Sequence, residues 1–136
     1  MVLSVVAHID GASRGNPGPA GIGVLIKTEE KNLSKISEYM GDEYTNNQAE
    51  YKALVRCLER CKELKVEKAK ILSDSNLLVN QMNGKYDVKS DNIKNLYNKA
   101  KKLESKFKKI KYEHIPREKN KIADNLANKS IEEELN

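Results

Sequence analysis

Residues 2–28 read VLSVVAHIDGASRGNPGPAGIGVLIKT and contain the pattern from which the start of the fold is predicted. The alternation of apolar residues over 2–10 predicts a strand with one apolar face. Residues 11–21 are rich in Gly and Pro, which predicts a turn region unsuited to the interior of a helix or strand. A second strand is expected over 22–28 and a weaker third strand over 33–40. The three strands are expected to form an antiparallel meander.

The apolar residues then change to a spacing of three and four positions. They recur at Tyr51, Leu54, Val55, Leu58, Cys61 and Leu64, which predicts an amphipathic helix of about five turns capped by Thr45 or Asn46. The remaining elements are expected in this order: a short strand over 70–73, a helix over 75–82, a helix over 91–107, a strand over 110–115 and a helix over 123–135. This order predicts an α/β layer fold, in which the meander joins parallel crossovers within a single domain over 1–136.

The charge of the chain is concentrated in one region. The net charge is +5 over 136 residues, but residues 85–121 alone carry 13 basic and 5 acidic side chains, a net charge of +8. Such a block favours a polyanionic partner. A solvated, lysine-rich helix surface explains it equally well. The chain has no Trp, one Phe and six Tyr, so base stacking is not expected to dominate nucleic-acid binding.

Two sequence features bear on the cellular compartment and on metal binding by cysteine. No apolar run approaches the roughly 18 residues of a membrane span, and residues 1–10 lack the basic start of a signal peptide. We therefore expect a cytoplasmic protein with no membrane partner. Cys57 and Cys61 lie one helical turn apart with no nearby His. They are expected to be small, semi-buried residues and not zinc ligands.

Four acidic residues stand at strand ends and helix starts. Asp10 ends the first predicted strand, Glu50 lies near the start of the long helix, Asp74 follows the 70–73 strand, and Asp124 begins the last helix. In an open α/β sheet these positions converge on one edge. Carboxylates crowded there repel one another unless a divalent cation neutralises them. Each acid alone is explained as well by a turn, a cap or the helix dipole; the four together predict a metal site.

Four segments carry a family resemblance. IDGASRGNPGPAG (9–21), TNNQAEY (45–51), LSDSNLLVNQMNG (72–84) and HIPREKNKIADNLA (114–127) resemble, in order, the signature blocks of type 1 ribonucleases H. Each block contains one of the four acids. The resemblance implies a ribonuclease H-like fold: a five-stranded mixed sheet, antiparallel meander plus parallel strands, with helices on both faces.

The resemblance also implies an activity. The chain is expected to be a metal-dependent endoribonuclease that cuts the RNA strand of RNA–DNA hybrids, leaving 5′-phosphate and 3′-hydroxyl ends. Two Mg²⁺ ions, or Mn²⁺ as a substitute, are expected on the four carboxylates. Asp10 is expected to bridge both ions, Asp74 and Asp124 to complete one site each, and Glu50 to bind a metal and face the ribose.

Further residues are assigned by the same resemblance. Those expected to read the 2′-hydroxyl of the RNA are Ser13, Asn16, Asn46, Asn47 and Asn76, together with Glu50. Thr45 is expected to contact a phosphate of the DNA strand, and His114 to assist proton transfer or product release. Turn and cap duties remain open for the asparagines, and a fixed position at a strand end remains open for His114.

The sequence departs from many bacterial members between the two middle helices. Residues 83–90 are too short for a basic protrusion and contain no Trp, so the chain resembles the compact form without one. A substitute phosphate-binding surface is expected from lysines 99, 101, 102, 106, 108, 109 and 111. Gly18 to Gly23 lack the helix or the GK[ST] of a nucleotide-binding loop, so no nucleotide cofactor is expected.

Several alternatives stay open at the level of sequence. Activity on RNA–RNA duplexes is undecided, and a monomer is expected. The alternatives are a non-cleaving module that binds hybrid or double-stranded RNA, another nuclease class on the same fold, and a protein that binds polyanions nonspecifically.

Overall fold

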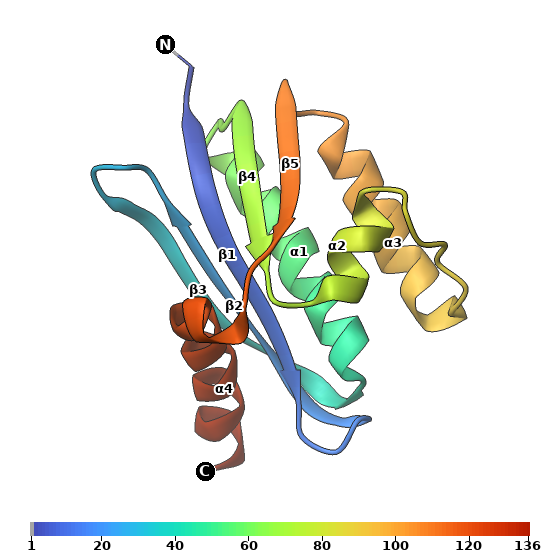
Figure 1. Ribbon diagram of the computed structural model, residues 1–136. Helices are drawn as coiled ribbons and strands as arrows, with labels where there is room; N and C mark the ends of the chain where they lie inside the picture. Colours follow the sequence, from blue (N-terminus) through green and yellow to red (C-terminus); the bar gives the residue numbers. More distant parts are fainter. Residues whose placement is uncertain (1) are drawn as a thin grey trace.

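A computed structural model describes residues 2–136 as one mixed sheet with helices packed on it (Figure 1). The strands are β1 (Ser4–Ser13), β2 (Gly18–Lys27), β3 (Asn32–Tyr44), β4 (Lys68–Ser73) and β5 (Lys109–His114). The helices are α1 (Asn46–Glu63), α2 (Asn76–Met82), α3 (Asp91–Glu104) and α4 (Lys121–Leu135), with a short 3₁₀ turn, η1 (Arg117–Lys119), before α4.

The sheet has the order β3-β2-β1-β4-β5. β1 pairs with β2, and β2 with β3, in antiparallel fashion, whereas β4 lies parallel to both β1 and β5. This arrangement confirms the predicted α/β fold with an antiparallel meander that continues into parallel strands. It also brings the ends of β1 and β4, the strands that carry Asp10 and precede Asp74, side by side.

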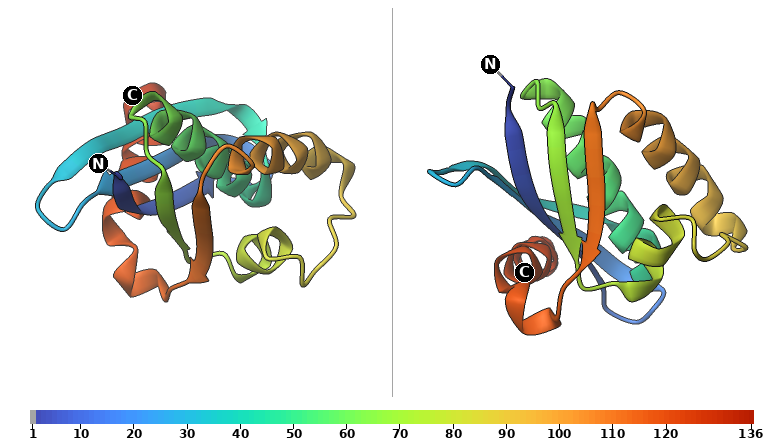
Figure 2. Two further views of the ribbon diagram at one scale, coloured as in Figure 1. Left: turned by 90° about the horizontal axis from the view of Figure 1, so that it is seen from above. Right: turned by 45° about the horizontal axis from the view of Figure 1, so that its top comes forward.

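Helices cover both faces of the sheet, as predicted (Figures 1 and 2). Val5, Ala7 and Ile9 of β1 are buried in the core cluster that includes the apolar side of α1, and α3 packs beside α1. α4 packs on the opposite face, over β2 and β3. Cys57 and Cys61 are both buried and free on α1. Within residues 2–136, no helix combines the length and the apolar character of a membrane span.

The prediction of a turn region over 11–21 was wrong. β1 continues to Ser13 and β2 begins at Gly18, so only residues 14–17 connect the strands. The glycines inside β2 allow α4 to pack closely against this strand. A Cβ on Gly21 would lie 1.9 Å from Ser130 Oγ, and one on Gly23 would lie 2.0 Å from the carbonyl oxygen of Ala123. Glycine in a strand interior commonly marks such an approach.

Smaller differences concern element ends. β3 runs on to Tyr44, four residues beyond the predicted 33–40, and α4 begins at Lys121, two residues before the predicted start. α3 ends at Glu104, and α1 begins after Thr45, whose side chain accepts a hydrogen bond from Gln48 N–H in a capping box. The predicted cap at Thr45 is thereby confirmed.

Candidate active site

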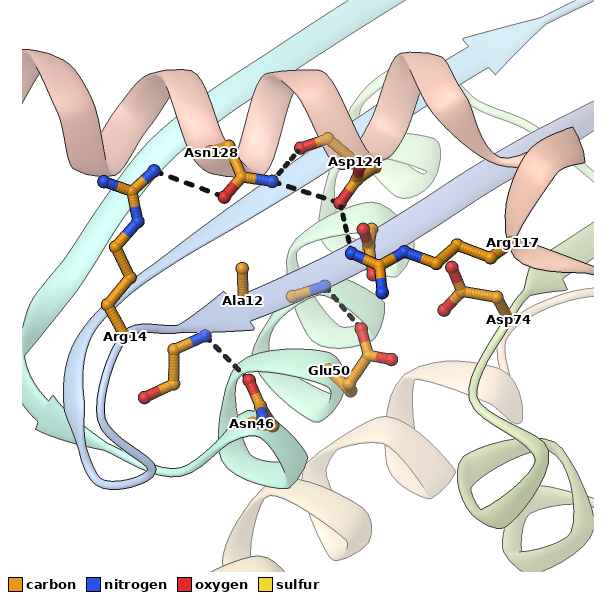
Figure 3. A pocket seen from close by; sticks show the side chains of 11 residues that line it. Ala12, Arg14, Asn46, Glu50, Asp74, Arg117, Asp124 and Asn128 are labelled. Carbon is orange, nitrogen blue, oxygen red and sulfur yellow. Dashed lines mark hydrogen bonds and ion pairs between the residues drawn. The ribbon is translucent and has the colours of Figure 1, made fainter.

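The four acids predicted from the sequence line a single cleft of about 490 Å³ (Figure 3). β1 supplies Asp10, α1 supplies Glu50, the residue after β4 is Asp74, and α4 supplies Asp124. The complete lining is Asp10, Gly11, Ala12, Ser13, Arg14, Asn46, Glu50, Asp74, Arg117, Asp124 and Asn128. The predicted convergence at one edge of the sheet is therefore present in the structure.

Gly11 lets α1 bring Glu50 to the end of β1. A Cβ at this position would lie 2.2 Å from the carbonyl carbon of Ala49 and 2.4 Å from the amide nitrogen of Glu50. The Gly11 N–H donates a hydrogen bond to the Glu50 carboxylate. The missing side chain therefore sets the distance between helix and strand, and places Glu50 beside Asp10.

Three carboxylates form the centre of the cleft. Asp10, Glu50 and Asp74 each offer an oxygen, and these oxygens all lie within 4.8 Å of one another. Burial, followed by the charge of Asp74, raises the pKa of Asp10 to about 8. Burial and the Asp10 charge raise the pKa of Glu50 well above its ordinary value, and burial raises the pKa of Asp74. These carboxylates repel one another when all three are ionised, and a divalent cation would relieve that repulsion. Their oxygen atoms are the ligands that a hard divalent cation prefers.

Asp124 lies at the edge of this cluster and has polar partners of its own. Its Oδ1 accepts a hydrogen bond from Asn128 Nδ2 at 3.1 Å and lies 3.9 Å from Arg117 Nη2. In Figure 3 the Arg117 guanidinium lies between Asp124 and Asp74. Asp124 therefore shares the cleft, but its oxygens are not part of the close triad.

Asn120 fixes the start of α4 against β1. It is buried, its Nδ2 donates to the carbonyl of Ile9 at 2.9 Å, and its own backbone carbonyl accepts from the Asp124 N–H at 3.0 Å. Asn120 therefore connects Ile9, the residue before Asp10, to the first turn of α4, which carries Asp124.

The predicted substrate residues are only partly gathered at the cleft. Ser13 N–H donates to Asn46 Oδ1 at 2.8 Å, and Asn46 N–H donates to Asn16 Oδ1 at 2.9 Å. Ser13 and Asn46 line the cleft, and Asn16 joins them through this bond. Thr45 lies next to them as the cap of α1.

Asn47, Asn76 and His114 are not among the residues that line the cleft. Asn76 is exposed at the start of α2, and His114 is exposed at the end of β5, where it pairs in register with Ser73. The roles assigned to these residues stay predictions.

Sequence reasoning missed Arg14, Arg117, Asn120 and Asn128. Asn128 follows Asp124 by four residues on a helix, a spacing that places both on one face. Arg117 and Asn120 stand in the same block as Asp124, and Arg14 stands in the first block. Helical spacing could have identified Asn128. The positions of Arg14, Arg117 and Asn120 depend on the backbone path of residues 14–17 and 114–121, which has no periodic pattern in the sequence.

Comparison with known proteins agrees with this geometry. The family model described as "Reverse transcriptase-like" matches residues 8–130. The chain is 41% identical over 132 residues to the "Bifunctional protein Rv2228c" of Mycobacterium tuberculosis, a match that covers 96% of the chain and 36% of that protein. It is 35% identical over 130 residues to "Ribonuclease HI" of Halobacterium salinarum, covering 95% of the chain and 65% of that protein. The chain thus spans about a third of the first relative's length and about two-thirds of the second's.

Solved structures give the same result. LC11-RNase H1 in complex with an RNA/DNA hybrid superposes with a TM-score of 0.91 at 40% identity, over 97% of this chain and 99% of that one. The N-terminal RNase H domain of Rv2228c, also 40% identical, gives a TM-score of 0.91 over 95% of this chain and 99% of that one. RNase H1 of Halobacterium salinarum gives a TM-score of 0.91 at 33% identity, over 96% of this chain and 98% of that one. The chain belongs to the type 1 ribonuclease H family.

Proposed function

We propose that the chain is an endoribonuclease that hydrolyses the RNA strand of RNA–DNA hybrids and leaves 5′-phosphate and 3′-hydroxyl ends. The observation that carries this proposal is the carboxylate triad of Asp10, Glu50 and Asp74, with oxygens within 4.8 Å of one another. The family relatives support it, since LC11-RNase H1 was solved with such a hybrid.

The cleft suits Mg²⁺, or Mn²⁺ as a substitute. Asp10 has both Glu50 and Asp74 as neighbours, which suits it to be shared between two ions, and Asp124 stands where it can complete a second site. Two bound divalent ions supply Lewis acidity at the phosphate and an activated water. The carboxylates would hold such ions, while Asn128 positions Asp124 and Asn120 fixes the start of α4.

The side-chain amides of Asn16 and Asn46, beside the cleft, would discriminate RNA from DNA. The side-chain oxygens of Asn16 and Asn46 accept hydrogen bonds from backbone N–H groups. In the part of the chain that the structure describes, no hydrogen bond engages the Nδ2 of either residue. Each Nδ2 group can donate a hydrogen bond to a 2′-hydroxyl oxygen, an acceptor that DNA lacks.

Asn46→Asp tests this assignment, because it keeps the oxygen that accepts from Ser13 N–H and removes the free donor. We expect kcat/KM on an RNA–DNA hybrid to fall about 10-fold, the value of one lost hydrogen bond. The matched control is a hybrid with 2′-deoxy substitution beside the cleaved bond. Equal losses on the two substrates would point to charge repulsion and contradict a role for the donor.

Arg117 stands where negative charge gathers during phosphoryl transfer. Its guanidinium is exposed, lines the cleft and lies 3.9 Å from Asp124. We expect Arg117→Ala to lower single-turnover cleavage of a hybrid about 10²-fold, because a cation aimed at the reacting phosphate is lost. Arg117→Lys keeps the charge and should retain more activity. Unchanged cleavage by Arg117→Ala would show that the guanidinium pairs only with Asp124.

His114→Ala is the companion variant, because the family resemblance implies a role for His114 in proton transfer or product release. We expect a smaller effect than for Arg117→Ala, since His114 lies outside the cleft lining. Pre-steady-state kinetics separate the two roles: a slower first turnover indicates proton transfer, and a slower steady state alone indicates product release. A variant that matches the wild type in both would contradict the assignment.

The proposed products are checked by mapping the new ends. RNA fragments from a hybrid should be ligated directly to a 3′-hydroxyl acceptor, because they carry 5′-phosphates. Fragments that need prior phosphorylation would contradict the proposed direction of cleavage. A hybrid that is bound but stays intact with either metal would instead favour a non-cleaving binding module.

A further inference from the structure

One part of the sheet carries a dense group of lysines. β4 and β5 turn Ala69, Ile71 and Tyr112 into the core, so the residues that alternate with them point to the other face. The exposed lysines on that face are Lys68, Lys70, Lys109 and Lys111, here called the sheet-face lysines. α4 covers β2 and β3, and in Figure 1 no helix passes in front of the upper parts of β4 and β5.

The strand register sets these lysines directly opposite one another. Lys68 pairs with Lys109, and Lys70 pairs with Lys111. Like charges at opposed positions of neighbouring strands destabilise a sheet. Within residues 2–136, the only carboxylate within 4.0 Å of any of the four is Glu113, which lies 3.6 Å from Lys70. The fold therefore keeps a repulsive arrangement that its own acids leave mostly uncompensated.

The lysines of α3 differ in this respect. Lys94 pairs with Asp91 at 3.3 Å, Lys99 with Glu59 at 3.4 Å and Lys101 with Glu104 at 3.3 Å. The surface predicted from lysines 99 to 111 is therefore not continuous. Two of its α3 members, Lys99 and Lys101, are paired with acids, whereas Lys109 and Lys111 lie on the opposite side of the sheet and join Lys68 and Lys70.

We infer that the sheet-face lysines form a second binding surface for a nucleic-acid phosphate backbone, which holds substrate beyond the segment being cut. The four lysines line a shallow hollow of about 220 Å³ with Ser4, Val5 and Ala69. The lining contains no aromatic side chain, so the surface suits phosphates and not bases. The choice of nucleic acid as the occupant rests on the proposed function.

The position of this surface fits an extended substrate. Lys70 lies three residues before Ser73, the end of β4, about 10 Å at the rise of an extended strand, and Asp74 is the next residue. A second hollow, of about 240 Å³, contains three lysines (Lys27, Lys119 and Lys121) and one acid, Glu118, in its lining. His8, also in this lining, lies on β1 opposite Leu72 of β4.

The test compares two variants with the same change in net charge. One is K68Q/K70Q/K109Q/K111Q; the control is K94Q/K99Q/K108Q/K129Q, whose four exposed lysines each pair with a carboxylate. On a hybrid of about 30 base pairs, the sheet-face variant should raise KM about 10-fold with kcat unchanged. Its plot of log affinity against log salt should become shallower by about 0.9 for each phosphate that the lysines no longer neutralise. The control variant should change KM less than about 2-fold.

Two further arms separate the explanations. A hybrid that extends only about two base pairs (about 7 Å) beyond the cut on the side of the sheet-face lysines does not reach them, and should show little difference between the variants. Equal effects of both variants would indicate general charge attraction and overturn the inference. An unchanged KM of the sheet-face variant would also overturn it. The same holds if that variant no longer binds vesicles with anionic lipid but still binds nucleic acid like the wild type. Fluorescence anisotropy with labelled duplex reports the surface even if no hybrid is cut, so failure of the proposed function remains distinguishable.

Discussion

Asp10→Asn is expected to abolish hydrolysis of an RNA–DNA hybrid while making the metal-free protein more stable at neutral pH. Asp10 lies between Glu50 and Asp74 in the carboxylate triad, so its loss removes the ligand best placed to serve two ions. We expect cleavage to fall at least about 10³-fold, comparable to the loss of a main charge-stabilising group. Single-turnover assays in saturating Mg²⁺ or Mn²⁺ measure this loss.

The gain in stability follows from the direction of the pKa shift. Folding raises the pKa of Asp10 from an ordinary value of 3.8 to about 8, so the folded state binds its proton more tightly than the unfolded state. The ionised carboxylate therefore destabilises the fold progressively as pH rises from about 4 to about 8, and the cost is constant above that range. An amide avoids this cost.

Thermal unfolding in chelator should show the difference directly. The melting temperatures of wild type and Asp10→Asn should nearly coincide near pH 4 and separate by more than about 10 °C near pH 8, with the variant higher. Millimolar Mg²⁺ should raise the melting temperature of the wild type more than that of the variant. A difference that is independent of pH would contradict a repulsive, buried carboxylate cluster.

Gly11→Ala is expected to have the second largest effect, because it adds an atom where the backbone of α1 touches β1. The new Cβ would lie 2.2 Å from the Ala49 carbonyl carbon, and backbone cannot move aside as a flexible side chain can. Overpacking of this kind costs about 3 kcal/mol. α1 should move away from β1 and carry Glu50 out of the triad, so cleavage should fall together with stability.

Gly84→Ala is the matched control. A Cβ at Gly84 would meet nothing within 4 Å, although its φ of +77° disfavours alanine. We expect a loss of about 1 kcal/mol in the free energy of unfolding and unchanged cleavage below the melting temperature. Urea unfolding and hybrid cleavage measure both effects. Similar behaviour of the two variants would show that contact between α1 and β1 does not position Glu50.

The convergence of the carboxylates on one edge could be predicted from the sequence because it follows from the topology, whereas the close approach of Glu50 also requires Gly11. Strand ends and helix starts of an α/β sheet meet at one edge, so Asp10, Glu50 and Asp74 had to converge once the order of elements was known. The partners of Asp124 could not be predicted in the same way. The residues between β5 and α4 follow no periodic pattern, and their path decides that Arg117 enters the cleft and His114 does not.

Glycine and lysine patterns were misread for a related reason. Gly21 reads locally as a turn residue, but α4, which follows much later in the chain, requires it inside a strand. The lysines of residues 85–121 read as one basic block, yet a helix and a strand distribute them to opposite sides of the sheet. In both cases a long-range contact determines the outcome.

Cleavage of an RNA–DNA hybrid, labelled at one end of the RNA, shows whether the carboxylate cleft is a nuclease site. Wild type and Asp74→Asn would be incubated with Mg²⁺, with Mn²⁺ and with chelator, beside matched RNA–RNA and DNA–DNA duplexes. We predict metal-dependent cutting of the RNA in the hybrid by the wild type, and its loss in Asp74→Asn. If both proteins bind the hybrid and neither cuts it with either metal, the proposed nuclease activity and the role of the carboxylates are wrong.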